Sequence, residues 1–136
     1  MNNEQLKKEM IRDEGYRKKL YTDSVGKLTI GIGHNIDDLG LSDRVIDMIY
    51  QEDLETAHSN LHRLYPQWQS LPEGRQHVLL NMSFNLGYRR FKGFKRFWKA
   101  VKADDTDGAI REMKDSRWYS QVGIRADRLI KMWRKS

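Results

Sequence analysis

Two carboxylates near the start of the chain, Glu14 and Asp23, stand in surroundings that would give them different acid strengths. Glu14 follows Leu6 and Met10 at helical spacing, so it ends the apolar face of a helix, whereas Asp23 falls in a polar turn. A carboxyl group among apolar neighbours favours its neutral form, while one in a wet turn stays ionised. Glycoside hydrolysis needs such a pair, because one acid protonates the leaving oxygen and the other carboxylate faces the sugar or its attacking water.

A hydroxyl lies close to this pair in the sequence. Apolar and small residues alternate along the segment Leu28, Thr29, Ile30, Gly31, Ile32 and Gly33. This alternation predicts a strand, and the turn at residues 22–27 predicts a hairpin. The strand face that carries Thr29 has little side-chain bulk, which often marks close approach by a ligand. We therefore expect the Thr29 hydroxyl to hold a water molecule beside Asp23.

Helical periodicity covers most of the remaining chain. Helices are predicted over residues 3–14, 43–63, 73–86, 94–102, 107–115, a short turn after Ser116, and 124–134. We expect Gly15 and Gly87 to end helices and Ser42 to cap one.

The fold class predicted by this pattern is α+β and mostly helical, in a single domain over residues 1–136. It has a small N-terminal β-hairpin lobe at about 16–41, a connecting helix at about 43–63, and a larger helical lobe at about 64–136 that includes the N-terminal helix. A cleft between unequal lobes is a common place for a ligand.

The composition of the chain excludes several kinds of chemistry. The chain has no cysteine, which excludes disulfides, thiol catalysis and cysteine-based metal sites. His58 and His62 have metal-ligand spacing, but no third ligand is near them in the sequence, so we expect no metal. Trp98, Trp118 and Trp133 have the helical spacing of core residues, and we expect them to serve packing.

Charge is distributed unevenly. Residues 89–136 carry 15 basic and 6 acidic side chains, although the whole chain has a net charge of only +6. A basic half suggests a polyanionic partner, either nucleic acid or a bacterial wall, or simply a solvated surface. No apolar run reaches transmembrane length, and the first residues have no apolar signal region, so we expect a protein made and held in a cytoplasm.

The stretch from Arg12 to His34 closely resembles the T-even phage lysozyme family, the muramidases of glycoside hydrolase family twenty-four. That family shows Glu, eight residues, Asp, five residues and Thr, and Glu14, Asp23 and Thr29 keep this spacing. Two further blocks resemble the family: Asn81-Met-Ser-Phe-Asn-Leu-Gly87, and Ser116-Arg-Trp-Tyr-Ser-Gln121 followed by Arg125-Ala126. The likeness covers nearly the whole chain and implies a lysozyme-like fold.

The resemblance implies catalytic roles for three residues. Glu14 is then the general acid, Asp23 is the carboxylate that positions water, and Thr29 is a second hydrogen-bond partner of that water. The family inverts the configuration at the anomeric carbon, which needs room for water opposite the leaving group.

Supporting and substrate-binding roles also follow from the resemblance. Asp13 and His34 match a structural ion pair, and Arg125 matches an arginine near the acid, where its charge would lower the acid's pKa against the effect of burial. Phe84 matches an aromatic residue on the cleft wall, and Asn35 a substrate-binding position.

The sequence departs from the family's type member in the segment between His34 and Ser42, which is much shorter here. The missing residues would form part of the lower lip of the cleft. Phe97 and Glu112 stand where the type member has different cleft residues, and we assign them no binding role.

The function implied is hydrolysis of the β-1,4 bond between N-acetylmuramic acid and N-acetylglucosamine in peptidoglycan, without cofactor or metal, leading to lysis of the host cell. We expect a monomer that binds no nucleic acid and does not insert into membranes. It would wait in the host cytoplasm and then act on the wall.

Three alternatives remain. A lytic transglycosylase of the same fold would need only the acid, a non-catalytic wall-binding module would need none of the three residues, and a basic nucleic-acid binder would be indifferent to Glu14.

Overall fold

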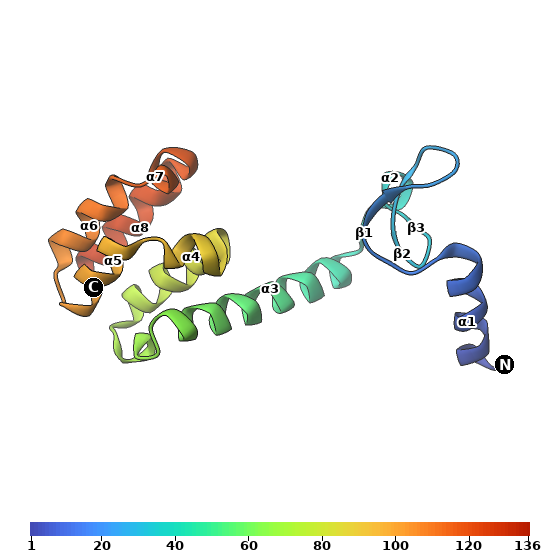
Figure 1. The fold of residues 1–136 in the computed structure, drawn as a ribbon, viewed down its shortest axis with the longest axis horizontal. Helices are drawn as coiled ribbons and strands as arrows, with labels where there is room; N and C mark the ends of the chain where they lie inside the picture. Colours follow the sequence, from blue (N-terminus) through green and yellow to red (C-terminus); the bar gives the residue numbers. More distant parts are fainter. The chain divides into compact units, whose positions relative to one another are not determined.

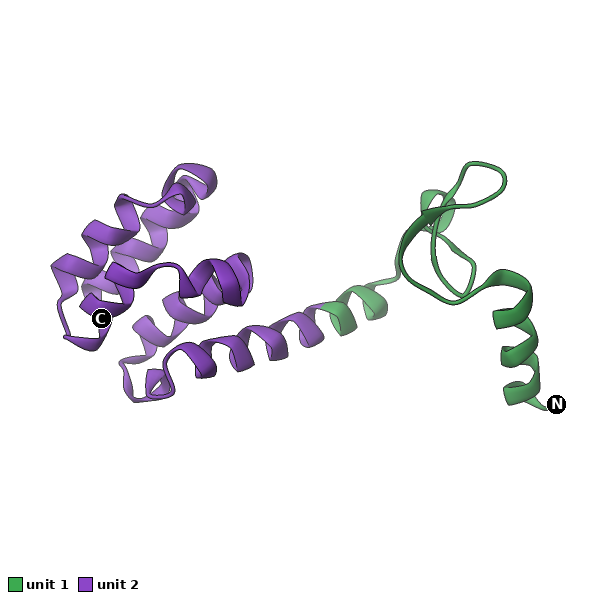
Figure 2. Ribbon diagram, in the orientation of Figure 1, with its two compact units in different colours: residues 1–49 green, residues 50–136 purple.

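The computed structural model describes all 136 residues, which form two compact units, residues 1–49 and residues 50–136 (Figure 2). The boundary between the units falls inside a long helix. The N-terminal helix is assigned to the first unit, and the expectation that it joins the helical lobe stays a prediction.

The first unit contains a helix, a small antiparallel sheet and a second, short helix (Figure 1). These elements are α1 (Asn3–Glu14), β1 (Arg17–Thr22), β2 (Leu28–Gly31), β3 (His34–Asn35) and α2 (Ile36–Leu39). The strand order is β1-β2-β3, with Tyr21 opposite Thr29 and Ile30 opposite His34. The predicted hairpin is therefore confirmed, and a third strand extends it.

The second unit is entirely helical. Its elements are α3 (Asp43–Leu64), whose first turns belong to the first unit, the 3-10 helix η1 (Trp68–Ser70), α4 (Glu73–Lys92), α5 (Lys95–Lys102), α6 (Thr106–Lys114), α7 (Arg117–Val122) and α8 (Ile124–Lys135). α5 packs on α6, and both α4 and α6 pack on α8 (Figure 1). The mostly helical α+β fold predicted from the sequence is confirmed.

Side-chain caps set several of the helix starts. The Val45 N–H donates to Ser42 Oγ at 3.3 Å, so Ser42 caps α3 as expected. The Tyr119 N–H donates to Ser116 Oγ at 3.2 Å at the start of α7. Such caps satisfy backbone donors that a helix start leaves without partners.

The hydrophobic core lies in the second unit. Its largest fully buried side chains include Trp118, Trp133 and Phe91, and Trp98 is buried beside them. The expectation that Trp98, Trp118 and Trp133 serve packing is thus confirmed. The first unit, taken by itself, buries only Thr29.

The strand around Thr29 differs from the prediction. The alternation was expected to continue to Gly33, but β2 ends at Gly31 because Gly31 and Gly33 both have positive φ, 70° and 68°. These values favour glycine and belong to a turn. Thr29, expected on an open strand face, is 3% exposed, whereas Leu28 beside it is exposed.

Gly87 was expected to end a helix, and its non-helical backbone, with φ 76° and ψ 172°, does interrupt α4 there; a second helical segment follows directly and extends α4 to Lys92. No helix was predicted in the short segment after His34, but this segment forms α2, which the Asn35 side chain caps by accepting the Asp38 N–H at 3.0 Å.

Candidate active site

Glu14 is the last residue of α1, and its backbone is tied to the sheet. Gly15 ends the helix with its N–H donating to Ile11 O at 2.8 Å. The Tyr21 hydroxyl donates to Glu14 O at 3.4 Å, which links β1 to this helix end. The Glu14 side chain is exposed within the unit, and α1 buries no side chain. The apolar surroundings expected for Glu14 are thus not provided by its own helix.

The Glu14 side chain lies against Gly33. A methyl group at position 33 would come within 2.9 Å of both Glu14 Cβ and Glu14 Oε2. Only glycine therefore leaves room for the carboxyl group over this turn. The lack of side-chain bulk at Gly33 was read as a sign of an approaching ligand, but the atoms that approach are those of Glu14.

Asp23 is fixed by the turn that joins β1 to β2. Its Oδ1 accepts the N–H groups of Val25 at 3.0 Å and Lys27 at 2.8 Å. Its own N–H donates to Lys27 O at 2.9 Å. Oδ2 accepts no hydrogen bond from the protein. One carboxylate oxygen thus sets the orientation, and the other is free to accept a hydrogen bond from a water molecule.

Thr29 is joined to Asp23 through the backbone of Lys27. The Thr29 hydroxyl donates to Lys27 O at 2.9 Å, the same carbonyl that accepts the Asp23 N–H. Because its hydrogen is used, the Thr29 hydroxyl can offer a water molecule only its lone pairs. No pattern in the sequence singles out Lys27, whose peptide group connects the two residues.

The segment after the sheet is held by its acidic residues. The Lys27 ammonium donates to Asp38 Oδ1 at 3.1 Å, and Asp37 Oδ2 accepts the Leu28 N–H at 2.6 Å. The hydrogen bond from Lys27 is the main cause that holds the pKa of Asp38 below its ordinary value, and the hydrogen bond from Asn35 adds to it. The same contact with Asp38 raises the pKa of Lys27.

The contacts of Asp13 and His34 differ from the ion pair that the resemblance implied. Asp13 and His34 do not form an ion pair: His34 Nε2 lies 2.6 Å from Gly40 O, and Asp13 faces Arg12 at 3.9 Å on the surface. Asn35 uses both ends of its amide on Asp38, since its Nδ2 also donates to Asp38 Oδ2 at 2.8 Å. Both ends of the Asn35 amide thus contact Asp38, and the role of Asn35 in substrate binding stays a prediction.

Phe84 and Arg125 belong to the second unit and line one cavity of about 390 Å³. Arg125 donates from Nε at 2.9 Å and from Nη2 at 2.7 Å to Asn81 Oδ1. The Phe84 ring is 40% exposed and lies 5.9 Å from the Tyr50 ring. Their roles beside the acid and on the cleft wall stay predictions.

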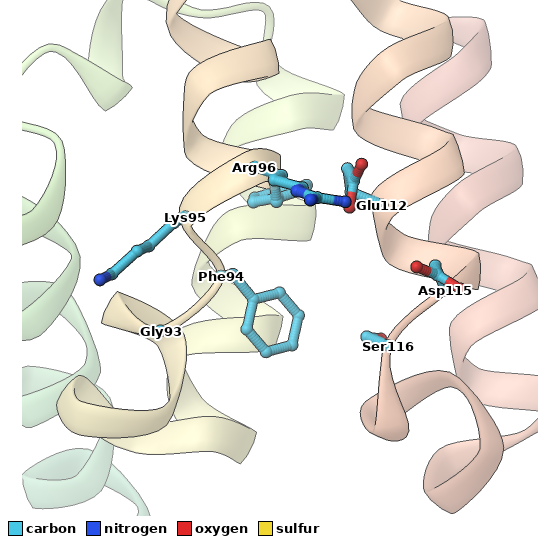
Figure 3. A pocket seen from close by; sticks show the side chains of 8 residues that line it. Gly93, Phe94, Lys95, Arg96, Glu112, Asp115 and Ser116 are labelled. Atoms are coloured by element: carbon cyan, nitrogen blue, oxygen red, sulfur yellow. The ribbon is translucent and has the colours of Figure 1, made fainter.

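A second cavity of about 300 Å³ lies between the start of α5 and the end of α6 (Figure 3). Phe97 and Glu112, to which no binding role was assigned, both line it. Phe97 is buried in the core, and its side chain has no polar atom. Of the two residues, only Glu112 therefore offers a polar group to this cavity.

One of the two histidines with metal-ligand spacing, His58, packs its ring on the Trp68 ring with centroids 5.3 Å apart. No helix combines the length and the hydropathy needed to cross a bilayer.

Comparison with known proteins identifies the family of the chain. The family model described as phage lysozyme matches residues 11–135. The chain therefore belongs to the phage lysozyme family, which places it in the lysozyme class of glycoside hydrolases.

Individual relatives differ in length. The chain is 30% identical to the pre-baseplate central spike protein Gp5 of Enterobacteria phage T4, over 89% of this chain and 26% of that protein. It is 26% identical to a probable T4-type lysozyme of Dictyostelium discoideum, with 90% of both chains covered. It is also 26% identical to the peptidoglycan hydrolase gp36 of Pseudomonas phage phiKMV, over 92% of this chain and 14% of that protein.

Proposed function

We propose that the chain is a muramidase that hydrolyses the β-1,4 bond between N-acetylmuramic acid and N-acetylglucosamine in bacterial peptidoglycan. The observation that carries the proposal is the arrangement of Asp23, whose Oδ1 is fixed by two backbone N–H groups while Oδ2 is free. Glu14 is attached to the same small sheet through its contact with Gly33. The relatives named as lysozymes and as a peptidoglycan hydrolase support the choice of substrate.

The first half of the reaction is proton donation. Glu14, in its neutral form, donates its proton to the glycosidic oxygen as the bond from that oxygen to the anomeric carbon breaks. The leaving sugar departs with a hydroxyl group, and the remaining sugar develops positive charge. The negative charge of Asp23 stabilises that developing charge.

The second half is attack by water. A water molecule donates one hydrogen to Asp23 Oδ2 and the other to a lone pair of the Thr29 hydroxyl, whose own hydrogen is held by Lys27 O. This leaves a lone pair of the water oxygen for the anomeric carbon. Asp23 takes the proton as the new bond forms, and the configuration at that carbon inverts.

The test is lysis of chloroform-treated bacteria, followed as loss of turbidity. Glu14→Gln and Asp23→Asn should each lower the rate by about a hundredfold or more, because each removes a proton donor or acceptor while keeping the size of the side chain. Wild-type rates in Glu14→Gln would rule out Glu14 as the acid.

Mass spectrometry of the digested wall identifies the reaction. Reducing muramic acid ends are expected, because water is the nucleophile. Anhydro ends would show that the sugar's own hydroxyl attacks and that the chain is a lytic transglycosylase.

We also propose that the protein acts as a monomer and causes lysis once it gains access to the wall. Its production in a bacterial cytoplasm should leave cells intact until the membrane is permeabilised, and light scattering after gel filtration should give one chain mass. Lysis without permeabilisation, or a stable dimer, would contradict these two points.

A further inference from the structure

Seven positively charged side chains lie between residues 89 and 102, and no acidic residue interrupts them. We name them the cationic strip: Arg89, Arg90, Lys92, Lys95, Arg96, Lys99 and Lys102. All seven side chains are exposed. The ion pairs of the chain involve other residues, so no carboxylate neutralises the strip by direct contact.

Helix α5 presents part of this strip as one face. Phe97, Trp98 and Val101 point into the core, while Lys95 and Lys99, followed by Lys102, remain exposed at spacings of four and three residues. Residues with these spacings share a helix face, and these three lysines extend over about 10 Å of helix. Figure 3 shows Lys95 pointing away from the cavity at the start of α5, whereas Arg96 points toward Glu112.

The strip is poorly suited to two kinds of anionic partner. Helices that lie in a membrane surface bury apolar side chains there, but the apolar side of α5 is already in the core. Single-stranded nucleic acid is held by aromatic rings on which bases stack. The Tyr88 ring next to the strip is covered by the Arg63 guanidinium at 3.8 Å.

We propose that the cationic strip binds the carboxylates of the peptide stems of peptidoglycan. This inference rests on the proposed function, since each muramic acid of the substrate carries a short peptide with free carboxylates. The substrate therefore presents repeated negative charges close to every bond to be cleaved. A strip of unneutralised cations complements these charges and keeps the enzyme on the wall between cleavage events.

The experiment measures binding to purified sacculi by sedimentation, in a protein that carries Glu14→Gln so that the wall is not digested. One variant replaces Lys95, Lys99 and Lys102 by Gln. The matched control replaces three exposed lysines elsewhere in the second unit by Gln, which removes the same charge: Lys114, Lys131 and Lys135. The strip variant should bind roughly tenfold more weakly, since an exposed ion pair contributes about a twofold to threefold change in affinity. The control should bind like the parent protein.

Chemically altered sacculi identify the partner. Binding should be lost when the stem carboxylates are converted to neutral amides, and kept when phosphate polymers are removed with hydrofluoric acid. Binding that survives amidation, binding that disappears with the phosphate, or equal weakening in the control variant would overturn the proposal. So would tighter strip-dependent binding to phosphatidylglycerol vesicles or single-stranded DNA than to sacculi.

The readout is independent of cleavage. If the protein binds sacculi through the strip, and amidation abolishes this binding, but the protein never cleaves them, the proposed function is refuted and the strip proposal stands. If the protein cleaves sacculi but binds them equally well without the strip, the strip proposal is refuted and the proposed function stands.

Discussion

Gly33 is the residue whose replacement most directly tests the placement of Glu14, the proposed general acid. Gly33→Ala puts a methyl group within 2.9 Å of Glu14 and also forces alanine to φ 68°. We expect a loss of roughly a hundredfold in activity, because small displacements of a catalytic group are costly. The left-handed backbone should also cost about 1–2 kcal/mol of stability.

Gly40→Ala is the matched control for this prediction. Gly40 has a similar φ of 61°, but a methyl group there would meet nothing within 4 Å. Both variants should lose stability in thermal unfolding because both hold alanine at a positive φ, while only Gly33→Ala should lose activity in the turbidity assay. Equal activity in the two variants would show that Glu14 does not need its place over Gly33.

Thr29 should matter through its hydroxyl. Thr29→Val keeps the shape of the side chain but removes both the donor to Lys27 O and the lone pairs proposed to accept from water. We expect about 1 kcal/mol of lost stability and a large fall in the rate of wall cleavage. Thr29→Ser should recover most of the rate, and a Thr29→Val protein with wild-type turnover would remove Thr29 from the mechanism.

Among the elements, α2 and the turn before β2 are joined by an ion pair that titrates in acid. The hydrogen bond from Lys27 holds the pKa of Asp38 below its ordinary value of 3.8. Because the pKa in the folded protein lies below the unfolded value, the pair's contribution to stability is complete above pH ~4. It is lost as the pH falls through the folded pKa.

Carbon NMR of the Asp38 carboxyl group measures this directly. The titration midpoint in the folded protein should lie below 3.8 and should move up in Lys27→Gln, since Lys27 is the main cause. The Asn35 hydrogen bond should leave part of the depression in that variant. An unchanged midpoint in Lys27→Gln would contradict the assignment.

Helix caps could be predicted from the sequence where the helix that follows was itself visible in the sequence. Helix starts at Ser42 and Ser116 were predicted because the capping serine and the N–H group that donates to it lie only three residues apart. The use of Asn35 as a cap was missed because a four-residue helix has no visible periodicity.

The candidate site could be predicted from the sequence only where its residues lie close together in the chain. The spacing of Glu14, Asp23 and Thr29 is visible in the sequence, and so is the polar turn that holds Asp23. The contact of Glu14 with Gly33 joins residues far apart in the chain, and no local pattern encodes it. His34 was expected to meet Asp13, but a nearby carbonyl, Gly40 O, takes its ring nitrogen instead.

At the scale of the whole molecule, the two units should differ sharply in stability. Every residue of the buried hydrophobic cluster lies in the second unit, from Leu61 to Trp133. Burial of apolar surface is the main favourable contribution to folding. A fragment of residues 50–136 should therefore fold cooperatively alone, and a fragment of residues 1–49 should not.

Circular dichroism and thermal unfolding of the two fragments check this prediction. Leu79, which is fully buried, supplies the control, because Leu79→Ala should destabilise both the full chain and the longer fragment by about 2–5 kcal/mol. A cooperative transition in residues 1–49 alone would show that the sheet carries more of the stability than its burial suggests.

The peptide group of Lys27 limits the changes in length that the β1–β2 connection tolerates. Its N–H and its carbonyl close hydrogen-bonded rings that contain Asp23 on one side and Thr29 on the other. The number of residues between these two proposed catalytic side chains is therefore fixed by ring closure, while the identity of Ser24 and Val25, both exposed, is not. A library randomised at these two positions should retain many active members, and one with a single inserted residue should retain almost none.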